Sequence, residues 1–186
     1  MTGPQPPSDP WNTAAPEPGP PAPDAAVLRV RDSRGQTVGV AFLVSDTTAL
    51  TCAHVVSAAL GTAGGAAPPP TARVRVDLPL VPAARHEGEA PSTTAGVEQW
   101  TAPREAGGPA PAAGPAAPGD IAVLRLDAPL PAARPVPLVD PGEVWGHRVR
   151  AFGIPAGRPG GVWHAGVLRG RQADGWVQAD LDGRGY

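Results

Sequence analysis

The 186-residue sequence contains no lysine, one cysteine and one methionine, and aromatic residues make up only 4% of it. A single cysteine cannot form an internal disulfide bond or supply the cysteine cluster of a zinc finger. No stretch approaches the ~18 uninterrupted apolar residues of a membrane span. The N-terminus lacks the basic and apolar segments of a secretory signal, and a formal net charge of −2 argues against a nucleic-acid partner. We therefore expect a cytoplasmic protein that binds neither membrane nor nucleic acid.

Proline and glycine are abundant, with 27 and 24 residues, together more than a quarter of the chain. Residues 1–24 are especially rich in proline, which removes backbone hydrogen-bond donors and favours extended backbone. We expect this segment to be a disordered leader, either a plain tether or a PxxP ligand for a partner domain. Residues 107–119 are a second Pro/Ala/Gly segment, which is typical of a surface loop.

Short strands separated by turns are predicted over the rest of the chain. Residues 37–45 are almost all apolar, which is typical of a strand buried on both faces or bent at a barrel corner, and residues 120–127 predict a buried strand. Alternation places Arg73, Arg75 and Asp77 on a solvent face. Many short strands with almost no helix indicate antiparallel barrels or a sandwich. The predicted strands are residues 26–32, 37–45, 47–50, 73–80, 96–102, 120–127, 147–154, 161–171 and 174–181.

Two polar residues lie where strands begin or end. His54 follows a predicted strand and lies near the start of a short helical turn predicted over residues 53–60, and its imidazole can exchange a proton near neutral pH. Asp120 precedes an apolar strand, where a carboxylate needs a hydrogen-bonding partner such as an imidazole N–H. Taken singly, each has a structural alternative: a strand-end histidine and a turn-capping aspartate.

The other reactive side chains are predicted to have structural roles. Cys52 is expected to be a small buried thiol that fills the barrel interior. His86 is expected in a solvated loop, whereas His147 and His164 should pack or hydrogen-bond in strands. No H-E-x-x-H motif or carboxylate cluster indicates a metal, and no cofactor is expected. Three tryptophans are predicted to pack in the core or at a barrel end: Trp145, Trp163 and Trp176.

Two motifs carry a family resemblance. The segment LTCAHVV around His54 is followed, 66 residues later, by GDIAVLRL around Asp120. Together they resemble the His and Asp segments of the trypsin-like, or chymotrypsin-like, serine proteases. GVAFLVSDTTAL is similar to the strand pair that leads into the family's His, and VWGHRVRAFGIPAGRPGGVWHAGVLRGR resembles the opening strands of its second barrel. The similarity runs from Ala25 to Tyr186. Within the family, the sequence resembles bacterial, intracellular members most.

The resemblance implies an all-β fold of two antiparallel barrels with the active site in the cleft between them. Residues 25–140 would form a complete first barrel that carries His54 and Asp120, and residues 141–186 an incomplete second barrel. His54 would act as general base and then as general acid, and Asp120 would orient it. The substrate would be a peptide or protein. An incomplete barrel would leave an unpaired edge at residues 175–181, so we expect weak folding beyond about residue 145.

The sequence departs from the family at the nucleophile. The family's Ser lies in a G-x-S-G-x-P segment whose backbone N–H groups also form most of the oxyanion hole, and no such segment occurs here. All five serines precede Asp120: Ser8, Ser33, Ser45, Ser57 and Ser92. We therefore expect the N-terminal portion of a serine endopeptidase, inactive as given, whose parent protein can carry fused C-terminal domains.

Two other interpretations stay open at this point. The first is a non-catalytic, protease-like binding or sensor module of a larger signalling or defence protein. The second is an unrelated β-sandwich in which His54 and Asp120 match the motifs by chance. The β-sandwich would place the two side chains far apart, so the distance between them discriminates it from the protease-like fold.

Overall fold

The computed structural model describes residues 23–62, 71–81, 90–102, 119–155, 157–172 and 176–181. Within these ranges, every predicted strand is found and the predicted helix is confirmed as α1. The proline-rich leader lies outside the described residues apart from its last two, which begin η1. In chain order the elements are η1 (Pro23–Ala26), β1 (Val27–Arg31), β2 (Thr37–Leu43), β3 (Thr48–Thr51), α1 (Ala53–Leu60), β4 (Val74–Asp77), β5 (Ser92–Thr101), β6 (Ile121–Leu126), β7 (Arg148–Gly153), β8 (Val162–Arg171) and β9 (Val177–Leu181).

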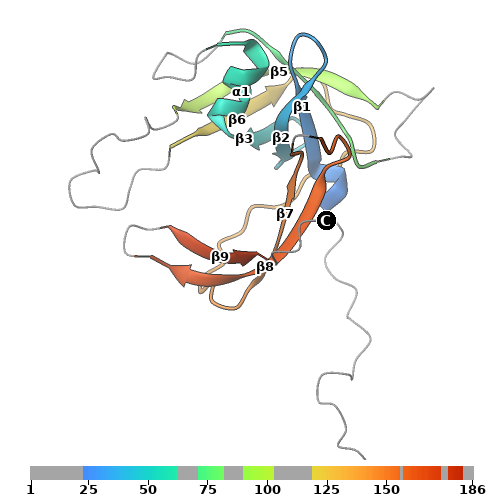
Figure 1. Cartoon of the computed structure of the whole chain (residues 1–186). Coiled ribbons are helices and arrows are strands. Elements are labelled where there is room, and N and C mark those ends of the chain that lie inside the picture. Colours follow the sequence, from blue (N-terminus) through green and yellow to red (C-terminus); the bar gives the residue numbers. More distant parts are fainter. Residues whose placement is uncertain are drawn as a thin grey trace, which may run out of the picture.

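Six strands close into an antiparallel barrel in the order β1-β2-β3-β6-β5-β4 (Figure 1). β1 pairs with both β2 and β4, and β3 pairs with β6, so no strand of this sheet is left at an edge. Burial of each large aliphatic side chain stabilises the barrel by about 1.5–3 kcal/mol. The largest fully buried side chains are Leu28, Leu43, Leu78, Leu124, Val30, Val56, Val74 and Val76. This is the complete first barrel that the resemblance implies.

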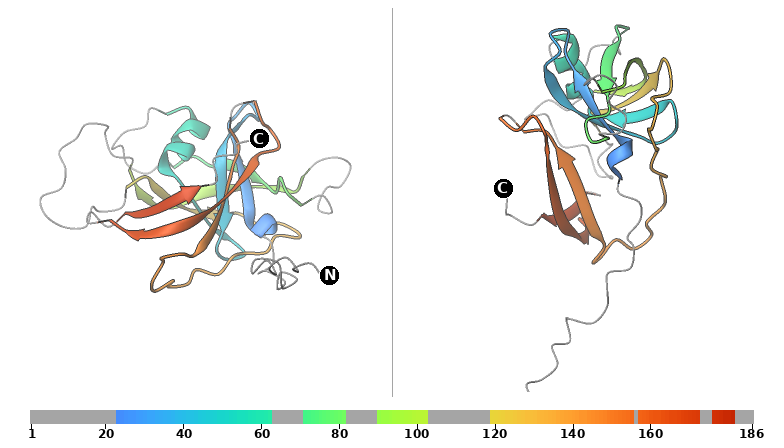
Figure 2. Two further views of the ribbon diagram at one scale, coloured as in Figure 1. Left: turned by 60° about the horizontal axis from the view of Figure 1, so that its bottom comes forward. Right: turned by 90° about the vertical axis from the view of Figure 1, so that its right-hand side faces the viewer.

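β7, β8 and β9 form a separate three-stranded antiparallel sheet beside the barrel (Figure 2). β8 is central and pairs with β7 on one side and β9 on the other. Three strands cannot close, so among the described residues the second barrel is incomplete, as expected. The fold is therefore all-β and chymotrypsin-like. The predicted domain boundaries after residues 24 and 140 stay predictions. No helix in the described ranges has the length and apolar character needed to cross a membrane.

β2 and β6 are each buried on one face only. This corrects the expectation of a buried strand at residues 120–127. For residues 37–45, it rules out the alternative of a strand buried on both faces. In β2, Ala41 lies inside the barrel, whereas Phe42 is 41% exposed. In β6, Leu124 lies inside and Ile121 is 40% exposed. The two exposed side chains line a cavity between the barrel and the second sheet, which explains why apolar residues stand on an outer face.

Asp77, at the end of β4, is only 3% exposed, although alternation predicted a solvent-facing residue. It does lie on the predicted face, opposite Arg29 in the β1–β4 register. Two arginine side chains cover it there. Arg29 Nε donates to Oδ1 at 2.9 Å, and Arg31 Nε donates to Oδ2 at 2.5 Å. This pairing offsets the cost of removing the carboxylate from water. Arg75 is exposed, as predicted.

The three tryptophans in and next to the second sheet do not all pack as predicted. Trp145 is 64% exposed and Trp176 is 57% exposed, which corrects the expectation of core or barrel-end packing. The reason is that the described second sheet is a single layer of three strands, which offers no interior. Trp163 does pack: its ring lies against Phe152, with centroids 5.1 Å apart, and under the Arg150 guanidinium at 4.6 Å.

Candidate active site

His54 is held at the start of α1, directly after β3. Cys52 is the N-cap residue of α1, with extended backbone dihedrals (φ −78°, ψ 143°). The helix is anchored on the barrel by the side chains of Val55 and Val56, which are buried. Because these apolar neighbours fix the helix, the imidazole is presented at the surface, with 60% of the side chain exposed. The predicted position of His54, near the N-terminal end of a helical turn, is confirmed.

Asp120 precedes β6 and is brought to His54 by strand register. In the antiparallel pairing of β3 with β6, Thr51 lies opposite Ala122. Residues just after Thr51 therefore face residues just before Ala122. The Asp120 N–H donates to the Ala102 carbonyl at 3.0 Å, and its φ of 63° lies in the left-handed region. Aspartate adopts this region more readily than most residues because its short polar side chain can hydrogen-bond locally.

The carboxylate of Asp120 contacts His54 twice. Oδ2 lies 2.6 Å from the imidazole Nδ1, and Oδ1 accepts a hydrogen bond from the His54 backbone N–H at 2.8 Å. A carboxylate can only accept, so Nδ1 carries a proton, and in the neutral imidazole Nε2 is then the nitrogen with the free lone pair. The second contact ties the carboxylate to the backbone and thereby fixes the ring orientation. The convergence of these residues, 66 positions apart, overturns the β-sandwich interpretation.

Cys52 is exposed rather than buried in the barrel, which corrects the sequence prediction. In β3 the side chain of Thr51 points inward, is 8% exposed, and donates from Oγ1 to the Val40 carbonyl at 2.7 Å. The extended backbone at the next residue sends the thiol outward, to the side of the Asp120 carboxylate. Partial burial raises the pKa of the Cys52 thiol, and the charge of Asp120 and a hydrogen bond to it raise that pKa further.

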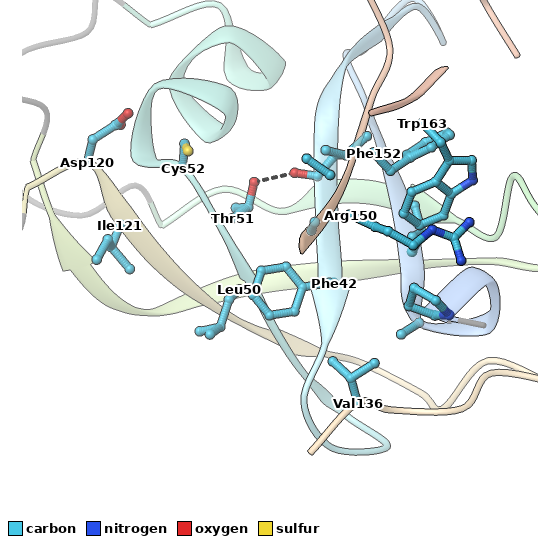
Figure 3. Close-up of a pocket in the computed structure, with 16 residues that line it drawn as sticks. Phe42, Leu50, Thr51, Cys52, Asp120, Ile121, Val136, Arg150, Phe152 and Trp163 are labelled. Carbon is cyan, nitrogen blue, oxygen red and sulfur yellow. Dashed lines mark hydrogen bonds between the residues drawn. The ribbon is translucent and has the colours of Figure 1, made fainter. Parts of the chain in front are cut away.

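A cavity of about 620 Å³ lies between the barrel and the second sheet (Figure 3). Cys52 and Asp120 stand at one end of it, and Arg150 and Trp163 stand at the other. Its lining is mainly apolar, with side chains from β2, β3, β6, β7 and β8. The resemblance implies a cleft at this place, and two side chains of the His54 region border it. The sequence pattern did not single out Arg150, because only the sheet packing shows that β7 faces the barrel.

The remaining histidines lie in other parts of the molecule. His147 is exposed just before β7, where its backbone carbonyl accepts from the Leu168 N–H at 2.8 Å. His164 is half-buried within β8. His86 lies outside the described residues. The structure therefore places His147 and His164 on or next to second-sheet strands, as predicted.

Three of the four serines in the described ranges are buried or have local contacts, and the fourth, Ser33, is exposed in the turn between β1 and β2. Ser57 is buried on α1, 5% exposed. The Oγ of Ser45 accepts from the Thr48 N–H at 3.0 Å in the turn between β2 and β3. The Oγ of Ser92 accepts from Arg75 at 3.3 Å. None of these three belongs to the second sheet, because no serine follows residue 92 in the sequence.

Comparison with known proteins identifies the family. The family described as "Trypsin-like peptidase domain" matches residues 39–185, well over half of the chain. No curated protein matches the sequence. One similar solved structure is the inactive form of the Rv3671c protease, with 22% identity, a TM-score of 0.43, and coverage of 81% of this chain and 55% of that one. Another is Deg5, with 20% identity, a TM-score of 0.49, and coverage of 86% and 69%.

The chain thus spans little more than half the length of the first of these structures. The match to the family, by contrast, extends across both sheets: it begins in β2 and ends beyond β9. The chain therefore belongs to the trypsin-like peptidase domain family.

Proposed function

We propose that this chain is the histidine- and aspartate-bearing part of a serine endopeptidase that hydrolyses peptide bonds. His54 is the general base and then the general acid, and Asp120 orients it. The observation that carries the proposal is the double contact, in which Nδ1 lies 2.6 Å from Oδ2 while the His54 N–H donates to Oδ1 at 2.8 Å. The substrate class is a peptide or protein.

The chemistry follows from the protonation pattern of the pair. With the proton on Nδ1, the lone pair of Nε2 can accept the proton of a hydroxyl as that hydroxyl attacks a carbonyl carbon. The negative charge of Asp120 stabilises the imidazolium that forms. The imidazolium then returns the proton to the departing amine, and water repeats the sequence on the acyl-enzyme.

The nucleophile is the part that this sequence does not supply. All five serines precede Asp120, and we propose that a serine from a downstream segment of a longer parent protein completes the site. Cys52 is a poor substitute, because its thiol hydrogen-bonds to Asp120, and burial and that carboxylate raise the pKa of the thiol, which leaves less of the nucleophilic thiolate. The 186-residue chain alone is accordingly expected to hydrolyse no peptide.

A fluorophosphonate probe, which labels activated serines, tests the proposal on the parent protein that includes the downstream segment. We expect labelling of the parent protein and loss of labelling in His54→Ala. His147→Ala is the matched control, because that histidine is exposed near the second sheet. The proposal fails if His54→Ala is labelled as fast as the unsubstituted protein.

A second candidate function is a non-catalytic, protease-like binding or sensor module. The observation that favours it is the position of the serines, all before Asp120. The coding sequence after Tyr186 discriminates the two. A G-x-S-G-x-P segment downstream supports the endopeptidase, whereas a stop codon followed by unrelated sequence supports the module.

A further inference from the structure

Three potential metal ligands of different chemistry converge beside the barrel. They are the thiol of Cys52, an imidazole nitrogen of His54 and a carboxylate oxygen of Asp120, and the three atoms all lie within 4.8 Å of one another. Two of the residues are neighbours at the start of α1, and the third comes from the segment before β6. The strand pairing of β3 with β6 therefore builds the cluster, which sequence spacing alone did not reveal.

We propose that Cys52, His54 and Asp120 form a binding site for a divalent transition-metal ion, with Zn²⁺ as the ion that fits best. Thiolate and imidazole are soft or borderline ligands that select Zn²⁺ over Mg²⁺ and Ca²⁺, which prefer several oxygen ligands. Three protein ligands leave the fourth tetrahedral position to a solvent molecule.

The geometry requires only a small adjustment. In a tetrahedral zinc site, with bonds of about 2.0–2.3 Å, neighbouring ligand atoms are about 3.3–3.7 Å apart. The three ligand atoms now lie within 4.8 Å of one another, so a movement of about 1 Å brings them to the separations of a zinc site. Cys52 is exposed and the His54 side chain is 60% exposed, so rotation of these side chains can supply the movement while β3 and β6 stay in place.

Binding of the ion displaces protons from two of the ligands. Nδ1 of His54 faces Oδ2 of Asp120 at 2.6 Å, and the metal takes the place of the proton between them. The displaced Nδ1 proton moves through solvent to Nε2, so the imidazole stays neutral. The thiol loses its proton as well, so a net one proton passes to solvent as the metal–sulfur, metal–nitrogen and metal–oxygen bonds form. The bound ion and the His54–Asp120 hydrogen bond exclude each other. The bound ion would therefore prevent His54 from acting as the general base. This consequence rests on the proposed function, but metal binding itself is independent of that function.

The test is a titration of the metal-free 186-residue chain with Co²⁺, followed by Zn²⁺. We expect a thiolate-to-cobalt charge-transfer band in the near ultraviolet, which requires the sole cysteine, and its loss when Zn²⁺ displaces Co²⁺. Cys52→Ala should abolish the band, and Cys52→Ala and Asp120→Asn should each weaken Zn²⁺ binding at least about tenfold. Circular dichroism of each variant establishes that it is folded.

His86→Ala and His147→Ala are the matched controls, and both should keep the band and the Zn²⁺ affinity. Absence of the band at saturating Co²⁺ overturns the site, as does unchanged Zn²⁺ affinity in Cys52→Ala or loss of affinity in His86→Ala. The fluorophosphonate experiment has a separate readout. A band without serine labelling would support the metal site and contradict the endopeptidase.

Discussion

The backbone N–H of His54 donates to the same Asp120 carboxylate that faces its imidazole Nδ1. The Asp120 side chain, just before β6, thus holds both the backbone and the ring of His54 in α1. The ring is consequently positioned by the strand pairing of the barrel and by the helix start together, and its tautomer is set by a group that can only accept.

Asp120→Asn should reverse the histidine tautomer while the chain stays folded. The amide can present its oxygen to one partner and its NH₂ group to the other, so the amide nitrogen faces Nδ1 and the imidazole proton moves to Nε2. Nitrogen-15 NMR of the imidazole in the 186-residue chain measures this directly. In the complete peptidase we expect kcat to fall by about 10⁴-fold. An unchanged tautomer in the variant would contradict the assignment.

Asp77→Ala should destabilise the barrel by about 3 kcal/mol, because it leaves Arg29 and Arg31 without their shared carboxylate. This figure is the lower end of the range for buried pairs, since both arginines retain some exposure. Denaturant unfolding measures the loss. Glu98→Ala is the control: its ion pair with Arg125 is exposed, and its removal should cost no more than about 1 kcal/mol. Equal losses in the two variants would disprove the structural role given to Asp77.

Gly39→Ala should force α1 away from β2. A Cβ at this position would lie 2.7 Å from both methyl carbons of Val55, and overpacking of this kind costs about 1–3 kcal/mol. Gly153→Ala is the control, because a Cβ there meets nothing within 4 Å. In a double-mutant cycle, Val55→Ala should relieve part of the loss, so the two effects should be less than additive. Strict additivity would contradict the close approach.

Cys52 should react slowly with iodoacetamide near neutral pH in the metal-free chain. Its pKa is raised by burial and by Asp120, so less of the reactive thiolate is present, and the rate should keep rising as pH increases past the pKa of an ordinary thiol. Asp120→Asn removes the negative charge, which lowers the thiol pKa and accelerates alkylation. Asp127→Asn is the control, because it also removes one negative charge from the chain, but at a different residue. Alkylation faster than that of a free thiol at neutral pH would contradict this prediction.

The two sheets should differ in hydrogen exchange. Each barrel strand has a partner on both sides, whereas β7 and β9 each pair with β8 alone among the described strands. We therefore expect amides of β7–β9 to exchange faster than those of β1–β6, in keeping with weak folding beyond about residue 145. Equal protection in both sheets would show that the second sheet is as stable as the barrel.

Much of the fold was predictable from the sequence because the strands have clear period-two patterns and Pro/Gly turns between them. The motifs around His54 and Asp120 also indicated two residues that the structure brings into contact. What escaped prediction depends on contacts between distant strands. The burial of Asp77 follows from the β1–β4 register, and the position of Cys52 next to Asp120 follows from the β3–β6 register. The exposure of Trp145 depends on how many strands the second sheet contains.

The outer strand β9 has a practical consequence. Among the described strands it pairs with β8 alone, and a row of N–H and C=O groups on its other side can template an additional strand. A separately produced polypeptide that carries the rest of the barrel could dock there. If the proposed endopeptidase function holds, proteolysis would then report whether the two fragments have met, as in a split enzyme.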